Sequence, residues 1–143
     1  MSDVMIEVKE TELLPIRSSE DVVLVRTAVR KLAQAIKFGL VDQTKIVTAA
    51  SEIARNTLDY GGGGEARLEL VRRLDAGQRA GLRLIFSDHG PGIPDIARAL
   101  TDGWTSGNGM GLGLSGTRRL MDEFQIASNP GEGTMVTITK WSR

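Results

Sequence analysis

The chain has no cysteine and a single histidine among its 143 residues. Without cysteine there is no thiol nucleophile, disulfide or thiolate metal site, and one histidine is too few for an ordinary zinc site. The charge is balanced, with 18 Lys and Arg residues against 18 Asp and Glu residues, so no net basic field attracts nucleic acid. These shortages argue against thiol enzymes, zinc enzymes and nucleic-acid-binding proteins.

Long apolar runs are missing as well. The N-terminus, beginning with Met1, has no charged region leading into an apolar stretch, and no segment approaches the ~20 apolar residues that span a membrane. We therefore expect a cytoplasmic protein that has neither a membrane nor a nucleic acid as a partner. The length and the 41% hydrophobic content suit one domain, residues 1–143, that buries a proper core.

Two amphipathic helices are predicted in the first half of the chain. Apolar residues recur at three- and four-residue steps over residues 19–38, with serines available as N-cap and Gly39 as the stop. The same pattern predicts a second helix over residues 42–60. Four glycines at residues 61–64 then predict a flexible connection.

Alternating apolar residues predict the strands. We expect a weak edge strand at residues 4–8, a hairpin of residues 66–71 and 82–87, and a final hairpin of residues 124–126 and 134–139. The second strand of the first hairpin is the more apolar and therefore the more central. Helices do not alternate strictly with strands, which favours an α+β two-layer sandwich with a mixed, mostly antiparallel sheet and helices on one face.

Glycine is abundant, with 17 copies, and stands at every second position over residues 107–113, here called the lid. Glycine costs backbone entropy on ordering and buries no side chain, so this run suits a place where the backbone approaches a ligand closely. A short helix is expected before it at residues 94–100, and an apolar helix directly after it. The helix after the lid would present its unpaired N–H groups at the glycines, which favours a flexible cover over the phosphates of a nucleotide.

Two other interpretations of the glycines compete with this one. A mobile surface linker is often glycine-rich, although linkers seldom interleave Met and Leu with glycines or continue into an apolar helix. Residues 111–116 also spell the dinucleotide fingerprint G-x-G-x-x-G, but the preceding residues 101–106 do not read as the buried strand that this motif requires. Polar residues elsewhere in the chain favour a cover over ATP.

These polar residues lie on the second helix and after the central strand. Glu52 and Asn56 are four residues apart and share a helix face, as pairs on an ordinary solvated face also do. Beside a nucleotide, the carboxylate can take a proton from an attacking hydroxyl, and the carboxamide oxygen can join phosphate oxygens around Mg²⁺. Asp88 ends the central strand, where it can accept a hydrogen bond from a base amino group or simply begin a turn.

The combination of Glu52-x-x-x-Asn56, Asp88-x-Gly90-x-Gly92 and the alternating glycines resembles the GHKL ATPase superfamily, whose members share the Bergerat ATP-binding fold. Three spaced motifs in order are far more specific than any one of them. More narrowly, the chain resembles RsbT-type switch kinases over nearly its whole length, starting near residue 5, in residues 51–56, 88–96 and 119–124 and in the closing Lys140-Trp141.

This resemblance implies a serine/threonine kinase of the anti-sigma-factor group. Its partners would be STAS-domain proteins of the stressosome and, on release, a phosphatase or another output protein. Its cofactors would be ATP and Mg²⁺, with Glu52 as the general base, Asn56 as the magnesium ligand and Asp88 as the adenine ligand. The implied ATP-binding residues are Asn56, Asp88, Gly90, Gly92, Ile93, Gly107, Gly109, Met110, Gly111, Leu112, Gly113 and Thr134.

The chain departs from this pattern before the lid. Residues 104–106 lack the arginine that some sporulation-type anti-sigma kinases carry there, which weakens the expectation of direct sigma-factor binding. Because neither the lid nor the loop after Asp88 contains lysine, charge at the transferred phosphate would be offset by magnesium, backbone N–H groups and Arg118 or Arg119. The alternative function is a nucleotide-dependent anti-sigma-type binding switch without kinase activity.

Overall fold

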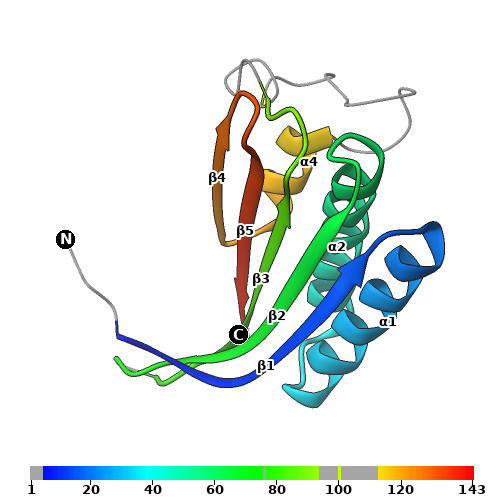
Figure 1. The fold of residues 1–143 in the computed structure, drawn as a ribbon. Helices are drawn as coiled ribbons and strands as arrows, with labels where there is room; N and C mark the ends of the chain where they lie inside the picture. The colour runs from blue at the N-terminus through cyan, green and yellow to red at the C-terminus, as the bar shows by residue number, and fades with distance from the viewer. Residues whose placement is uncertain (1–4, 76, 94–99, 101–112) are drawn as a thin grey trace.

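The computed structural model of the chain describes residues 5–75, 77–93, 100 and 113–143. In these residues, three helices cover one face of a five-stranded sheet (Figure 1). The elements in chain order are β1 (Ile6–Ile16), α1 (Ser19–Ala35), α2 (Leu40–Asp59), β2 (Gly64–Arg73), β3 (Ala80–Asp88), α4 (Gly113–Leu120), β4 (Glu123–Asn129) and β5 (Gly133–Trp141). Most of the predicted short helix at residues 94–100, and the lid before Gly113, lie outside the described residues.

The sheet has the strand order β1-β2-β3-β5-β4, and each neighbouring pair is antiparallel. β3 is the central strand, as its apolar sequence predicted, with Leu84 paired to Leu68 on one side and to Ile138 on the other. The α+β two-layer fold is therefore confirmed, and the described strands form no parallel pair.

β1 is longer than its pattern predicted, since it covers Ile6–Ile16 rather than residues 4–8. A bulge between Val8 and Glu10 shifts the alternation of side chains, and Pro15 resembles a strand breaker. Both features are tolerated because β1 is an edge strand, where a missing N–H breaks no ladder on the open side.

α1 begins as predicted and ends early. The Ser18 hydroxyl oxygen accepts the Asp21 N–H at 3.3 Å and caps the helix. At the other end Lys37 adopts a left-handed φ of 64°, and Phe38 N donates to Ala33 O, which is the hydrogen-bond pattern of a Schellman motif. Gly39, predicted as the stop of α1, is instead the N-cap of α2, so α2 begins two residues before the predicted Asp42.

The core lies between the sheet and the helices. α2 supplies a buried apolar stripe with Ile46, Ala50 and Ile53, and β3 faces it with Leu84 and Phe86. Because this stripe sets the rotation of α2, the polar residues of its second half come to lie beside the end of β3. No helix in the described part of the chain has the length and apolar character to cross a membrane.

Candidate functional site

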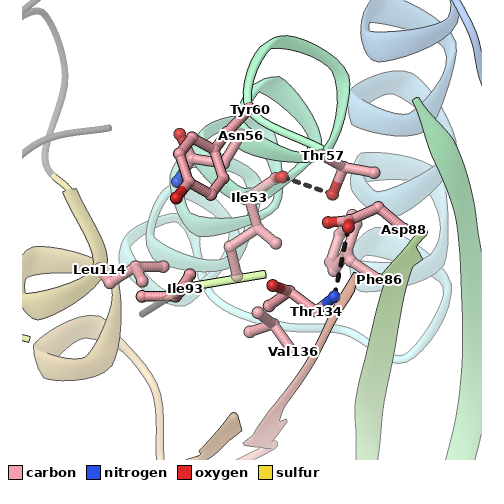
Figure 2. Close-up of a pocket in the computed structure, with 10 residues that line it drawn as sticks. All are labelled: Ile53, Asn56, Thr57, Tyr60, Phe86, Asp88, Ile93, Leu114, Thr134 and Val136. Carbon is pink, nitrogen blue, oxygen red and sulfur yellow. Dashed lines mark hydrogen bonds between the residues drawn. The ribbon is translucent and has the colours of Figure 1, made fainter. Parts of the chain in front are cut away.

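A pocket opens where α2, β3, β5 and α4 meet (Figure 2). Its empty space, with the open mouth included, is about 420 Å³. Four predicted ATP ligands, Asn56, Asp88, Ile93 and Thr134, line it. The other lining residues are Ile53, Thr57, Tyr60, Phe86, Leu114 and Val136. A mostly apolar wall with a few convergent polar groups suits a flat aromatic base.

Asp88 is a buried charged group of this pocket, with 9% of its surface exposed. Its Oδ1 accepts two backbone N–H groups, from Gly90 at 2.9 Å and from Thr134 at 3.2 Å (the latter drawn in Figure 2). Its Oδ2 accepts no hydrogen bond from the described residues. The carboxylate is therefore held in place through one oxygen, and within the described residues the other oxygen keeps its capacity to accept a hydrogen bond.

The glycines after α2 do not form the flexible connection that was predicted, because Gly61 packs directly against Asp88. A Cβ on Gly61 would collide with the Asp88 carboxyl group, and a Cβ on Gly90 would lie 2.6 Å from Gly61 O. Gly63 N donates to Thr57 O at 2.9 Å, with a left-handed φ of 104° at Gly63. Glycine is required here because two backbone segments meet without room for side chains.

The loop from Asp88 to Ile93 is fixed by side chains that the sequence motifs did not identify. The Tyr60 hydroxyl donates to Gly92 O at 3.0 Å, and the Ile93 N–H donates to Ser128 Oγ at 2.7 Å. Gly92 has a φ of 79°, and a Cβ there would collide with Asn129 O. Tyr60 follows directly after α2, but no local pattern marks Ser128, since its role depends on a contact across 35 residues.

Glu52 lies one helical turn before Asn56 on α2 and is half-buried, but it does not line the pocket itself. Its Oε2 accepts the N–H of Gly113, the last lid glycine, at 3.3 Å. Gly113 begins α4 with a φ of 71° and is buried. The structure thus brings the predicted base to the start of the helix after the lid, where backbone N–H groups lack helical partners.

The remaining predicted phosphate ligands, at residues 107–112, lie outside the described residues. Arg118 and Arg119 belong to the last turn of α4, at the opposite end of that helix from Gly113. Among the described residues, no cluster of three or more His, Cys, Asp or Glu side chains is arranged to hold a metal ion. Asn56 alone still fits magnesium, which takes few protein ligands and keeps its waters and phosphate oxygens.

Comparison with known proteins shows the family of the chain. Residues 41–142, well over half of the chain, match the family model described as histidine kinase-, DNA gyrase B-, and HSP90-like ATPase. The chain is 46% identical over 123 residues to the serine/threonine-protein kinase RsbT of Bacillus subtilis (strain 168), covering 86% of this chain and 90% of that protein. It is 28% identical over 133 residues to an anti-sigma F factor of Thermoanaerobacter sp. (strain X514), covering 91% of this chain and 92% of that protein.

A solved structure shares the fold. The crystal structure of the RsbU and RsbW domains of a Mycobacterium tuberculosis protein is similar with a TM-score of 0.63 at 21% identity, covering 94% of this chain and 33% of that chain. The chain therefore belongs to the histidine kinase-, DNA gyrase B- and HSP90-like ATPase family, as a homologue of the serine/threonine-protein kinase RsbT.

Proposed function

We propose that this chain is a cytoplasmic, ATP-dependent serine/threonine protein kinase that phosphorylates a STAS-domain partner in a bacterial stress-signalling switch. On release it activates a phosphatase or another output protein. The similarity to the kinase RsbT supports the activity. The observation that carries it is the convergence of Asn56, Asp88 and Thr134 on one pocket, with Glu52 one turn away on α2.

Adenine is the ligand that we assign to the pocket. Apolar side chains such as Ile53 and Phe86 offer a dry surface to the faces of a flat base. At the edge, Asp88 Oδ2 can accept a hydrogen bond from the exocyclic amino group of adenine, while its Oδ1 stays bound to two backbone N–H groups. A carboxylate that is already positioned gains this hydrogen bond without reorganisation.

Glu52 is the residue that we assign to proton transfer. ATP supplies the γ-phosphoryl group, the serine or threonine oxygen of the partner forms the new P–O bond, and ADP leaves. Glu52 accepts the hydroxyl proton as that oxygen attacks. Asn56 would hold magnesium beside the phosphates. Because Arg118 and Arg119 lie at the far end of α4, charge at the phosphate is assigned to magnesium and to backbone N–H groups instead.

The second candidate is a binding switch in which the nucleotide selects the partner and no phosphate is transferred. It is favoured by the similarity to anti-sigma F factors, which also extends over nearly the whole chain. A kinase leaves phosphate on the hydroxyl of its partner, whereas a pure switch leaves the partner unmodified. The two functions are therefore distinguished by the mass of the partner after incubation.

The test incubates the purified chain with ATP, Mg²⁺ and the STAS-domain proteins encoded in the same genome, and measures phosphate on the partner by mass spectrometry. Glu52→Ala should reduce transfer by at least about 100-fold while ATP still binds. Glu65→Ala, an exposed carboxylate on β2, is the matched control and should transfer normally. Normal transfer by Glu52→Ala would refute the base assignment, and ATP binding without transfer by the wild type would favour the switch.

A further inference from the structure

Ser128 connects the hairpin β4–β5 to the loop after Asp88. It lies on β4 opposite Thr134, with its side chain half-buried. Its hydroxyl oxygen is 2.7 Å from Ile93 N, 3.1 Å from Gly133 O and 2.8 Å from Thr134 Oγ1. One small side chain thus contacts two residues that line the pocket, although it does not line the pocket itself.

The valence of the hydroxyl fixes the direction of these three hydrogen bonds. A serine hydroxyl has one hydrogen and two lone pairs. The Ile93 amide only donates and takes one lone pair, whereas the Gly133 carbonyl only accepts and takes the hydrogen. When these two hydrogen bonds form together, only a lone pair remains for Thr134, so we assign the Thr134 hydroxyl as the donor of a pair that the distance alone leaves open in direction. With its only hydrogen given to Ser128, Thr134 Oγ1 can only accept from a ligand.

The part of the pocket edge formed by Asp88 and Thr134 consequently presents only acceptors. Thr134 Oγ1 is an acceptor, and Asp88 Oδ2 is an acceptor beside it, since Thr134 N binds Asp88 Oδ1 at 3.2 Å (Figure 2). A base that presents an amino group here meets matching partners. A base with a carbonyl in that place meets two acceptors, and such a mismatch costs more than a missing bond because the groups are desolvated.

We propose that Ser128 is a specificity-determining residue, which fixes Thr134 as a hydrogen-bond acceptor and anchors the Ile93 amide so that the site takes a 6-amino purine nucleotide and rejects the 6-oxo form. The inference rests on the proposed function for the identity of the ligand. Ser128 acts through Thr134 and Ile93 and does not touch the base. It is thus a positioning residue whose effect is on selectivity.

The first test measures the dissociation constants of ATP and of inosine triphosphate by calorimetry. In Ser128→Ala the Thr134 hydroxyl can rotate and donate, so the preference for ATP over the 6-oxo nucleotide should fall about tenfold. Ser128→Thr restores a hydroxyl and should restore the preference. Ser87→Ala, the same change next to Asp88 but on the opposite face of β3, should keep the preference of the wild type. An unchanged preference in Ser128→Ala would overturn the inference.

A second pair of variants tests whether Ser128 acts through Thr134. Thr134→Val removes the acceptor and should reduce the preference for ATP over inosine triphosphate as Ser128→Ala does. The double variant should narrow it no further, because residues in one hydrogen-bond network are not additive. A loss equal to the product of the two single losses would contradict the coupling.

The anchoring role is measured without nucleotide, by hydrogen exchange at the Ile93 amide. Ser128→Ala should speed this exchange about tenfold, and Ser128→Thr should return it to the rate of the wild type. An equal exchange rate of the Ile93 amide in the wild type and both variants would contradict the claim that Ser128 anchors this amide. A wild-type chain that binds neither nucleotide would refute the proposed function, while the Ile93 exchange rate would still decide the role of Ser128.

Discussion

The two ends of the sheet both bury a charged side chain, but they provide its partners differently. At the pocket end, the described partners of Asp88 are two backbone N–H groups on a single oxygen. At the opposite end, Lys140 is only 1% exposed, and its Nζ lies 3.5 Å from Asp42 Oδ1 and 3.9 Å from Asp122 Oδ1. Asp42 belongs to the first turn of α2, and Asp122 precedes β4.

The difference separates a structural charge from a binding charge. Around Lys140 both carboxylates also meet Arg143, and Asp122 Oδ2 accepts the Trp141 N–H at 2.7 Å, so the cluster is complete within the protein. Around Asp88, no described residue donates to Oδ2, which is the oxygen that we assign to the ligand. A buried charge therefore indicates a site only when the protein itself does not complete its partners.

Lys140→Met should disrupt the cluster of Lys140, Asp42 and Asp122 and cause the largest loss of stability. It would leave Asp42 and Asp122 together without their buried cation, which should cost about 3 kcal/mol of unfolding free energy. The measurement is urea denaturation, with the exposed Lys31→Met as control. Because the pocket lies at the other end of the sheet, Lys140→Met should keep its ATP affinity under conditions where it is folded. A loss of ATP affinity in the folded variant would mean that the two ends do not have separate roles.

Gly61→Ala should disturb the pocket end next most strongly. The added Cβ would overlap the Asp88 carboxyl group, which should cost about 2 kcal/mol and weaken ATP binding at least about tenfold. Gly39→Ala is the matched control for ATP affinity, because no atom lies within 4 Å of its Cβ position and its φ is −64°; as the N-cap of α2 it should lose only some helix stability. Equal effects of the two substitutions would show that close packing at Gly61 does not position Asp88.

Tyr60→Phe should have the smallest effect. It removes the hydrogen bond to Gly92 O but keeps the ring against the pocket, so ATP affinity should fall about threefold with little change in stability. Calorimetric titration measures the affinity. A loss as large as that of Gly61→Ala would mean that the hydroxyl of Tyr60 contacts the ligand directly.

Most of the fold followed from periodicity, because α1, α2 and the hairpins bury one regular face each. The continuation of β1 beyond residue 8 does not follow from the sequence pattern. A bulge interrupts the alternation and Pro15 is typical of a strand end, and both features are permitted because β1 is an edge strand. The end of α1 was missed because Lys37, not a glycine, takes the left-handed conformation.

The candidate site was predictable where local motifs carry it and not where it depends on tertiary contact. Asn56, Asp88 and Thr134, which the resemblance to the ATPase superfamily implies as ligands, line one pocket, and their roles stay a prediction. The collision of a Gly61 side chain with Asp88, and the hydrogen bond of Ser128 to Ile93, join segments that no sequence pattern relates. The phosphate contacts of residues 107–112 stay a prediction.

The most direct test of the account is calorimetric titration of the wild type and of Asp88→Asn with ATP and Mg²⁺. The asparagine keeps an oxygen for the N–H groups of Gly90 and Thr134, so folding should change little, but its NH₂ group would face the adenine amino group. The account predicts that the wild type binds and that Asp88→Asn binds at least about 100-fold more weakly. Equal binding by both proteins would contradict the assignment of this pocket to adenine.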